Sequence, residues 1–385
     1  MANNKKKKKL PWQKWLFTMV LLSVGGVCGY AIASYMDRMA TAGQSMGSGL
    51  ISLGLLLLGF LAVLFLQIIV HEGGHLLFGL LSGYTFSSFR VGSFMVIKQE
   101  GKLRFKRLSL TGTGGQCLMA PPDLVDGKIP FVLYNLGGSL MNLLAAALCL
   151  GLYFSARAVP WLPLFLLMGA IVGAAYALLN GIPLRLGVVD NDGRNAWSLG
   201  RDPAALRAFW LQLKLNALVA QGVRLKDMPE EWFQVPEGGA LNNSMTAALG
   251  VFACNRMMDA HRFQSARVAM ERLLAANSAL VGMYRNLLLN DLLYCELLFE
   301  NRPDRLDRML TKGQKEFMKA MKTYPSILRT AYAYALLAQK DAKKAKQIKE
   351  TFQKIGRSYP YPSDWESEGE LMALAEAKAS TQQEV

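Results

Sequence analysis

The residues most able to do chemistry in this 385-residue chain form one short motif, His71-Glu72-Gly73-Gly74-His75. Residues four apart lie on one face of an α-helix, so both imidazoles can reach a single metal ion. Glu72 lies beside them and can take a proton from a metal-bound water. The chain has only three histidines, and two of them are in this motif. The spacing therefore predicts a metal site with its own general base.

A catalytic zinc ion needs three protein ligands and an open position for water. The remaining histidine, His261, lies in a distant segment that is typical of a soluble domain, so we expect a carboxylate as the third ligand. Asp190 and Asp192 form the acidic cluster that a membrane core can bring back to the motif. The residues alone leave open which of the two aspartates binds the metal.

The elements that must position this motif are four long apolar runs, Trp15–Tyr35, Ile51–Val70, Phe131–Phe154 and Trp161–Leu179. The second run has no charge and would span about 30 Å as a helix, the thickness of a bilayer core. The histidine motif follows it directly. Ionisable side chains are costly inside a bilayer, so their presence at the end of such a run indicates function.

The composition combines 52% hydrophobic with 18% charged residues and a net charge of +15. This apolar content excludes a disordered chain. The positive charge indicates an anionic partner. We expect an anionic lipid surface and no nucleic acid, because no nucleic-acid-binding motif is present. Lys and Arg gather between the second and third runs, which marks that side as cytoplasmic. These features predict a multi-pass plasma-membrane protein, bacterial in type, with cytoplasmic N- and C-termini.

The N-terminal segment, residues 1–48, is predicted to be a basic cytoplasmic tail with Lys5–Lys9 and a first transmembrane helix. An alternative is a secretory signal with a cleavage site near Ala31-Ile32-Ala33. The five cysteines are scattered and form no Cys-x-x-Cys pair, which indicates reduced thiols and no disulfide framework.

The third run has one small, polar face, made by Asn135, Gly138, Ser139 and Asn142 at i, i+3, i+4 and i+7. If this face meets the metal site, Asn142 can donate a hydrogen bond to a substrate carbonyl or to the developing oxyanion. The alternative is that the small residues serve close helix–helix packing.

These residues resemble the site-2 proteases, a family of intramembrane zinc metalloproteases, over roughly residues 50–200. The motifs that carry the resemblance are His71-Glu72-x-x-His75, Gly138-x-x-x-Asn142, and Asn180-x-x-Pro183 followed by Asp192-Gly193. The gap between Asn180 and Asp192 is longer than in many members, which keeps Asp190 as an alternative ligand.

The resemblance implies one Zn²⁺ per chain, held by His71, His75 and Asp192, with Glu72 and Asn142 as catalytic residues. It also implies that Asn135, Ser139 and Asn180 contribute to substrate binding. The implied activity is that of a zinc metalloendopeptidase, which hydrolyses a peptide bond of a membrane-embedded protein or peptide near the cytoplasmic face.

Between the second and third runs, residues 86–110 are predicted to form a β-hairpin. Its strands would be Ser87–Lys98 and Lys102–Leu110, joined at Gln99-Glu100-Gly101. In the family a β-element near the active site engages substrate in extended form, and strand addition offers the substrate backbone its hydrogen-bond partners. The alternative is a structural hairpin whose basic side chains meet anionic lipid.

The C-terminal half is predicted in three parts. Residues 201–240 would form a membrane-surface helix and a linker, because Trp, Phe and Leu alternate with Arg and Lys before a Pro/Gly-rich stretch. The alternative for this helix is an ordinary amphipathic helix that packs on the next domain. Residues 241–370 have helical periodicity and are predicted to form a tetratricopeptide-like cytoplasmic domain, available to a cytoplasmic protein partner. Residues 371–385 would be a tail.

The expected fold is therefore mainly α: a polytopic membrane protein with four transmembrane helices and a small cytoplasmic β-hairpin, followed by a soluble helical hairpin-repeat domain. Residues 49–200 would be the intramembrane metalloprotease core. The alternative function is a non-proteolytic membrane scaffold or transporter accessory with a structural metal site. Glu72 argues against it, because a structural site needs no general base.

Overall fold

The computed structural model describes residues 12–41, 46–109, 113–156, 159, 161–186, 189–276 and 279–383. The predicted basic stretch Lys5–Lys9 lies outside these residues. The chain divides into two compact units. Unit 1 comprises Met1–Gly83 and Pro130–Gly200, and unit 2 comprises Tyr84–Ile129 and Arg201–Val385. The segment between the second and third apolar runs therefore folds with the C-terminal half and not with the predicted 49–200 core.

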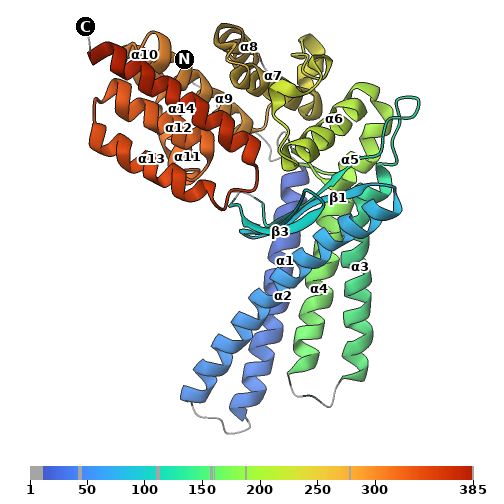
Figure 1. Ribbon diagram of the computed structural model, residues 1–385. Coiled ribbons are helices and arrows are strands. Elements are labelled where there is room, and N and C mark those ends of the chain that lie inside the picture. The colour runs from blue at the N-terminus through green and yellow to red at the C-terminus, as the bar shows by residue number, and fades with distance from the viewer. Residues whose placement is uncertain are drawn as a thin grey trace, which may run out of the picture. The chain divides into compact units, whose positions relative to one another are not determined.

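Unit 1 is built on four long helices (Figure 1), α1 (Trp12–Thr41), α2 (Met46–Leu81), α3 (Val132–Ser155) and α4 (Leu162–Gly181). Each is long and apolar enough to cross a membrane by length and composition. In the most apolar window of α1 and of α2 only 11% of the residues are buried. The apolar character of these two helices is therefore not explained by packing within the protein.

Helices α1, α2 and α4 share a core formed by Cys28, Ile32, Leu56, Leu164 and Met168. Alongside this core α2 packs on α3, and α3 packs on α4. Beyond α4 the chain forms a short antiparallel ribbon, β5 (Arg185–Leu186) with β6 (Val189–Asp190), and then the short helix α5 (Asp192–Ser198). Helix α5 packs against α3 and α4, so the predicted acidic cluster returns to the helices that carry the polar motifs.

Unit 2 begins with a four-stranded antiparallel sheet in the order β3-β2-β1-β4. The strands are β1 (Thr85–Val91), β2 (Phe94–Gln99), β3 (Lys102–Arg107) and β4 (Gly115–Ala120). The predicted turn at Glu100-Gly101 is present, and both residues have the positive φ that a tight hairpin turn requires.

The predicted strand Ser87–Lys98 is two strands, because the chain turns at Gly92 (φ 60°) between two stretches of strand-forming residues. The hairpin is therefore only one edge of a larger sheet. Strand β4 is not distinguishable in the sequence, since it follows a Gly-rich stretch and pairs with β1, which lies far back along the chain.

Helix α6 (Pro203–Ala220) favours the alternative of a helix packed on the next domain over a membrane-surface helix. Its consecutive residues Phe209, Trp210 and Leu211 are all buried, so the helix is covered on more than one side. It packs between β4 and the helix α7, and Trp210 Nε1 donates a hydrogen bond to Pro122 O (2.9 Å). An aromatic-rich helix with scattered basic residues is equally suited to a protein core, and that is the role that α6 has here.

The rest of unit 2 is helical. Three short 3₁₀ turns, Leu225–Asp227, Glu230–Trp232 and Gly238–Asn242, occupy the predicted linker. They are followed by α7 (Ser244–Asp259), α8 (Phe263–Ala275), α9 (Gly282–Phe299), α10 (Pro303–Met309), α11 (Lys312–Ala320), α12 (Pro325–Ala333), a π-helical turn (Tyr334–Ala338), α13 (Ala342–Gly356) and α14 (Pro362–Gln383).

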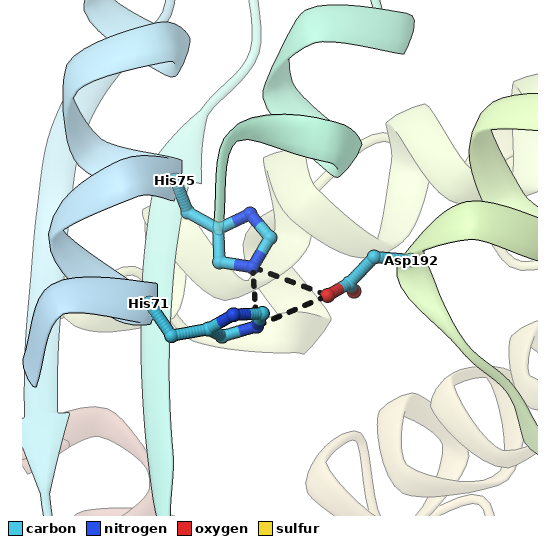
Figure 2. Close-up of side chains that lie close together, drawn as sticks. All are labelled: His71, His75 and Asp192. Atoms are coloured by element: carbon cyan, nitrogen blue, oxygen red, sulfur yellow. Dashed lines mark hydrogen bonds and ion pairs between the residues drawn. The ribbon is translucent and has the colours of Figure 1, made fainter. Parts of the chain in front are cut away.

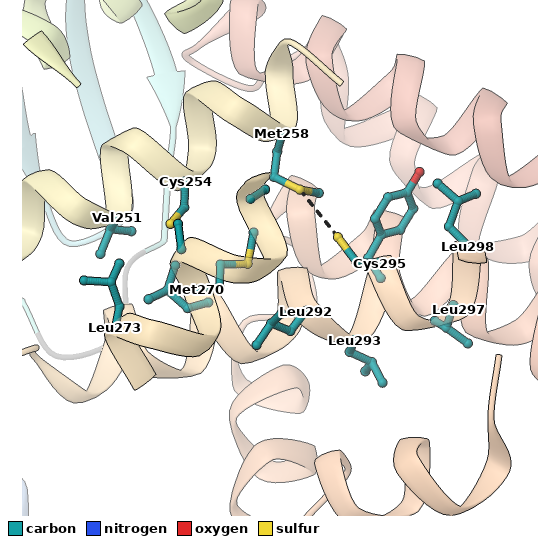
Figure 3. Packing of buried hydrophobic residues seen from close by; sticks show 14 of the residues in the cluster. Val251, Cys254, Met258, Met270, Leu273, Leu292, Leu293, Cys295, Leu297 and Leu298 are labelled. Atoms are coloured by element: carbon teal, nitrogen blue, oxygen red, sulfur yellow. Dashed lines mark hydrogen bonds between the residues drawn. The ribbon is translucent and has the colours of Figure 1, made fainter. Parts of the chain in front are cut away.

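The core of these helices is shown in Figure 3, where side chains of α7, α8 and α9 interlock. Cys254 and Cys295 are fully buried in it as small apolar residues. The helical character predicted for residues 241–370 is present, while the repeat character of the domain stays a prediction. The predicted tail is wrong as far as residue 383, because α14 continues through residue 370 and buries Leu371, Met372 and Ala375.

Candidate metal centre

Three predicted ligands meet at one point in unit 1. His71 Nε2 lies 3.2 Å from His75 Nε2 and 3.2 Å from Asp192 Oδ2, and His75 Nε2 lies 3.3 Å from the same oxygen. Figure 2 shows the two imidazoles projecting from successive turns of α2 toward the carboxylate, which comes from the start of α5. Both histidines are nearly buried, whereas the Asp192 side chain keeps 27% of its exposure. The cluster is therefore open on the side of the aspartate.

Glycines allow α2 and α3 to lie in close contact beside this cluster. At Gly74 a Cβ atom would overlap Gly137 O, so the two backbones touch at this crossing. At Gly138 a Cβ atom would lie 2.5–2.7 Å from three atoms of the His71 ring. The glycines of the two motifs thus serve one purpose, which is to let the His71 imidazole lie flat against the backbone of α3.

A chain of buried amides fixes the protonation of His71. Gly169 O can only accept, so Gln67 turns Nε2 toward it (3.0 Å) and Oε1 toward Asn142 Nδ2 (2.7 Å). Asn142 Nδ2 also donates to Gln67 O (3.0 Å), and Asn142 Oδ1 consequently faces His71 Nδ1 at 2.7 Å. His71 Nδ1 must therefore carry a proton, which leaves a lone pair on Nε2 when the ring is neutral.

His75 is fixed in the same tautomer by a backbone carbonyl. Its Nδ1 lies 2.8 Å from Tyr134 O, which can only accept a hydrogen bond. Nε2 of the neutral ring then presents a lone pair toward His71 and Asp192. Both imidazoles are held in the orientation that metal-binding histidines require, with the non-ligating nitrogen donating to a partner.

The donor set fits a zinc ion. Zn–N and Zn–O bonds of 2.0–2.2 Å at tetrahedral angles place neighbouring ligand atoms about 3.3–3.5 Å apart, and the three separations here are 3.2, 3.2 and 3.3 Å. With both rings neutral, three electron-rich atoms at this spacing repel one another unless a cation lies between them, either a metal ion or protons on the Nε2 atoms. One divalent ion would satisfy all three and leave a fourth position on the open side.

Asp192 reaches this point through its neighbours. The Asn191 side chain caps α5 by accepting from Arg194 N (2.9 Å), also accepts from Leu184 N (3.0 Å), and donates to Leu179 O and Ile182 O (2.7 Å each). These contacts pin the start of α5 to the end of α4.

Gly193 permits the same approach, since a Cβ atom there would overlap Gly181 O. Asp190 is directed elsewhere, with its Oδ1 3.3 Å from Arg185 Nε. The structure thus brings Asp192, and not Asp190, to the histidines.

The electrostatics of the two aspartates differ accordingly. Burial alone would raise the pKa of Asp192, but the charges and hydrogen bonds of His75 and His71 outweigh it and hold the pKa well below its usual range. Asp192 is therefore an anion that can serve as a ligand. Burial raises the pKa of Asp190, and Arg185 and Arg194 only partly offset this effect.

The other predicted site residues have varied surroundings. Glu72 is 8% exposed and lies in the same helical turn as His71. Asn135 and Asn180 donate to carbonyls of their own helices, Phe131 O and Tyr176 O. Ser139 is buried, and its Oγ has no hydrogen-bond partner among the residues that the structure describes. Asn142 is fully buried with its amide engaged as described, so its predicted role at the oxyanion stays a prediction.

Sequence reasoning missed two residues of this site. Gln67 lies one helical turn before His71, and the signal was a lone amide in an otherwise apolar run. Asn191 directly precedes the Asp-Gly pair, and the signal was the preference for Asn at a helix N-cap. Both act on the ligands and not on the metal position itself.

The comparisons with known proteins add no evidence about this site. No protein-family model matches the chain, and neither a curated protein nor a solved structure is significantly similar to it.

Proposed function

We propose that this chain is an intramembrane zinc metalloprotease of the site-2 protease type. The observation that carries the proposal is the triangle of His71 Nε2, His75 Nε2 and Asp192 Oδ2, with edges of 3.2–3.3 Å. It lies at the end of a helix whose composition suits a bilayer, and Glu72 is adjacent in the same turn. A structural metal site would have no use for this glutamate, so hydrolysis is favoured over a scaffold role.

In the proposed reaction, a bound zinc ion supplies a Lewis acid that lowers the pKa of a water molecule at the open position. Glu72 takes the proton from the attacking water and then gives it to the leaving amine. Ser139 Oγ, buried and free of partners among the described residues, is available to donate to the substrate carbonyl. The amide chain Gln67–Asn142 keeps His71 in the ligating tautomer throughout.

The proposed setting is a plasma membrane, with α1 to α4 as spans and both termini in the cytoplasm. The exposed apolar faces of α1 and α2 support the spans, and the basic residues between α2 and α3 support the orientation. The substrate is then a membrane-embedded protein or peptide cut near the cytoplasmic face. The helices of unit 2 would form a hairpin-repeat module that binds the substrate or a regulatory protein.

The test compares wild type with Glu72→Gln, expressed in cells and then purified in detergent. We expect both to bind one zinc ion per chain, because Glu72 is not a proposed ligand. Mass spectrometry of the cell membranes should find new peptide ends inside apolar segments with wild type only. Equal cleavage by both forms would refute the proposed chemistry.

A matched pair of substitutions tests the ligand set separately. Asp192→Asn should lower zinc affinity by at least about tenfold, since it removes the anionic ligand, whereas Asp190→Asn should leave it unchanged. If both retain zinc but Asp192→Asn loses cleavage, Asp192 acts on the substrate and the metal site is assigned wrongly.

A further inference from the structure

The sheet of unit 2 has two faces of opposite character. Because antiparallel partners share a face, Met95, Ile97 and Gln99 of β2 lie together on one side. This side is buried: Met95 and Ile97 pack with Ala220 and Tyr359, and Gln99 Nε2 donates to Ala220 O and Pro360 O. The helices of unit 2 therefore cover this face of the sheet at β2, while the outer strand β3 stays exposed.

On the opposite face, the outer strands β2 and β3 expose large apolar side chains in the part of the chain that the structure describes. The register pairs on this face are Phe94 with Arg107, Val96 with Phe105, and Lys98 with Leu103. Phe94, Leu103 and Phe105 are 64%, 63% and 85% exposed. We call these three residues, with Lys98 and Arg107, the aromatic–basic face. Large apolar side chains gathered in this way usually mark a contact surface, because a solvent-facing sheet normally carries polar residues there.

The charge around this face identifies its partner. Lys98 and Arg107 lie on this face, and Lys102, Arg104 and Lys106, which alternate with it along β3, add positive charge at the same edge of the sheet; Glu100 is the single acid of residues 85–109. Arg107 lies over the Phe94 ring at 5.3 Å, so the cationic and aromatic groups are interleaved on the same surface. Such a surface repels a second copy of itself and is attracted to an anionic one.

We propose that the aromatic–basic face docks onto the anionic surface of the membrane that unit 1 crosses, with Phe94, Leu103 and Phe105 inserted at the level of the lipid headgroups. Strand β1 begins four residues after α2 ends, so the chain delivers the sheet directly from a candidate span. Aromatic side chains favour the headgroup region, and neighbouring Lys and Arg bind its phosphates. The inference rests on the proposed membrane setting of unit 1, and it is independent of the proposed proteolysis.

The test measures the surroundings of position 105 in the full chain. Phe105→Cys is made in a Cys149→Ala background, because the other four cysteines are buried. The protein is spin-labelled and reconstituted in nanodiscs that contain either phosphatidylcholine alone or phosphatidylcholine with phosphatidylglycerol. Asp304→Cys, on an exposed position of α10, is the matched control. Collision rates with oxygen, which concentrates in lipid, and with a water-soluble nickel chelate then report the environment.

We expect the oxygen-to-nickel collision ratio at position 105 to exceed that at position 304 severalfold in anionic discs. The ratio should fall in neutral discs, in high salt, and in a Lys98→Gln/Arg107→Gln variant, because each change weakens the attraction to lipid phosphate. All the substituted side chains of the sheet are on its uncovered face, so the fold should be retained.

Three results would overturn the proposal. Equal collision ratios at positions 105 and 304 in anionic discs would show that the face is in water. A label at position 105 that is shielded from both reagents would show that it is buried against protein. A label that responds to added single-stranded RNA, and not to anionic lipid, would assign the face to nucleic acid.

Discussion

Replacing Asn142 by Leu would remove the acceptor of His71 Nδ1–H without a large change in side-chain volume. His71 Nδ1–H would then be buried without an acceptor. Gln67 Oε1 would lose the hydrogen bond that Asn142 Nδ2 donates to it at 2.7 Å. Removal of a partner that orients a ligating histidine usually lowers metal affinity about 10- to 100-fold, or ~1.4–2.8 kcal/mol. We expect Asn142→Leu to fall in this range.

Gln67→Met should have a smaller effect, below about tenfold. In that variant Asn142 Nδ2 retains its bond to the backbone oxygen of residue 67 at 3.0 Å, so Asn142 Oδ1 still faces His71. Asn135→Leu is the matched control on the same helix, because the Asn135 amide donates to Phe131 O and not to a ligand. The control should leave metal affinity unchanged.

The assay is competition for Zn²⁺ or Co²⁺ between the detergent-purified protein and a chromogenic chelator, with thermal unfolding of the metal-free forms as a check on folding. The graded order Asn142→Leu, Gln67→Met, Asn135→Leu would support the amide chain. Unchanged metal affinity with lost peptide cleavage in Asn142→Leu would refute it and would favour the oxyanion role for Asn142.

Three further predictions follow from the packing and the charges. Gly74→Ala should destabilise the protein by about 1–3 kcal/mol, because the added Cβ would overlap Gly137 O. Gly73→Ala should not, because the space around Gly73 is open. Thermal unfolding of the two variants in detergent checks this difference. Asn191→Ala should lower Zn²⁺ affinity, measured by chelator competition, since four hydrogen bonds that place Asp192 are lost. Burial and the nearby Asp259 raise the pKa of Asp364 to about 7, so this carboxyl is protonated in the folded state over a pH range where the unfolded chain has lost its proton. The stability that the protonated Asp364 contributes is thus present near pH 4 and lost as the pH rises through 7. Asp364→Asn should flatten this pH dependence and stabilise unit 2 by about 1–2 kcal/mol at pH 8. Urea unfolding followed by tryptophan emission measures both effects. An unchanged pH dependence in Asp364→Asn would contradict this assignment.

Local patterns in the sequence predicted the parts of the fold that depend on neighbouring residues. The four apolar runs became α1 to α4, and the turn at Glu100-Gly101 is where two flexible residues interrupt a run of strand formers. The turn at Gly92 was missed because the apolar residues on both sides of it read as one strand. The sequence left open whether α6 lies on the membrane or packs within the protein, because its partners, β4 and α7, are other segments of the chain that a helical pattern does not identify.

The same distinction applies to the site. The spacing of His71 and His75 follows from the helix period, which the sequence contains. The choice of Asp192 over Asp190 depends on how Asn191 anchors α5 to α4, and the bond from Asn142 to His71 depends on a crossing that two glycines permit. These relations exist only between segments that fold together, so a single sequence cannot specify them.

The division of the chain into two units has a mechanical consequence for the metal site. The chain passes from one unit to the other three times, directly after Gly83, Ile129 and Gly200. Each passage is within eight residues of a group that builds the site, namely His75, the carbonyl of Tyr134, and Asp192. A ligand that shifts or stiffens unit 2 would therefore act on all three segments at once through covalent links. Such an effect on the proposed metal site would need no direct contact between the ligand and the site.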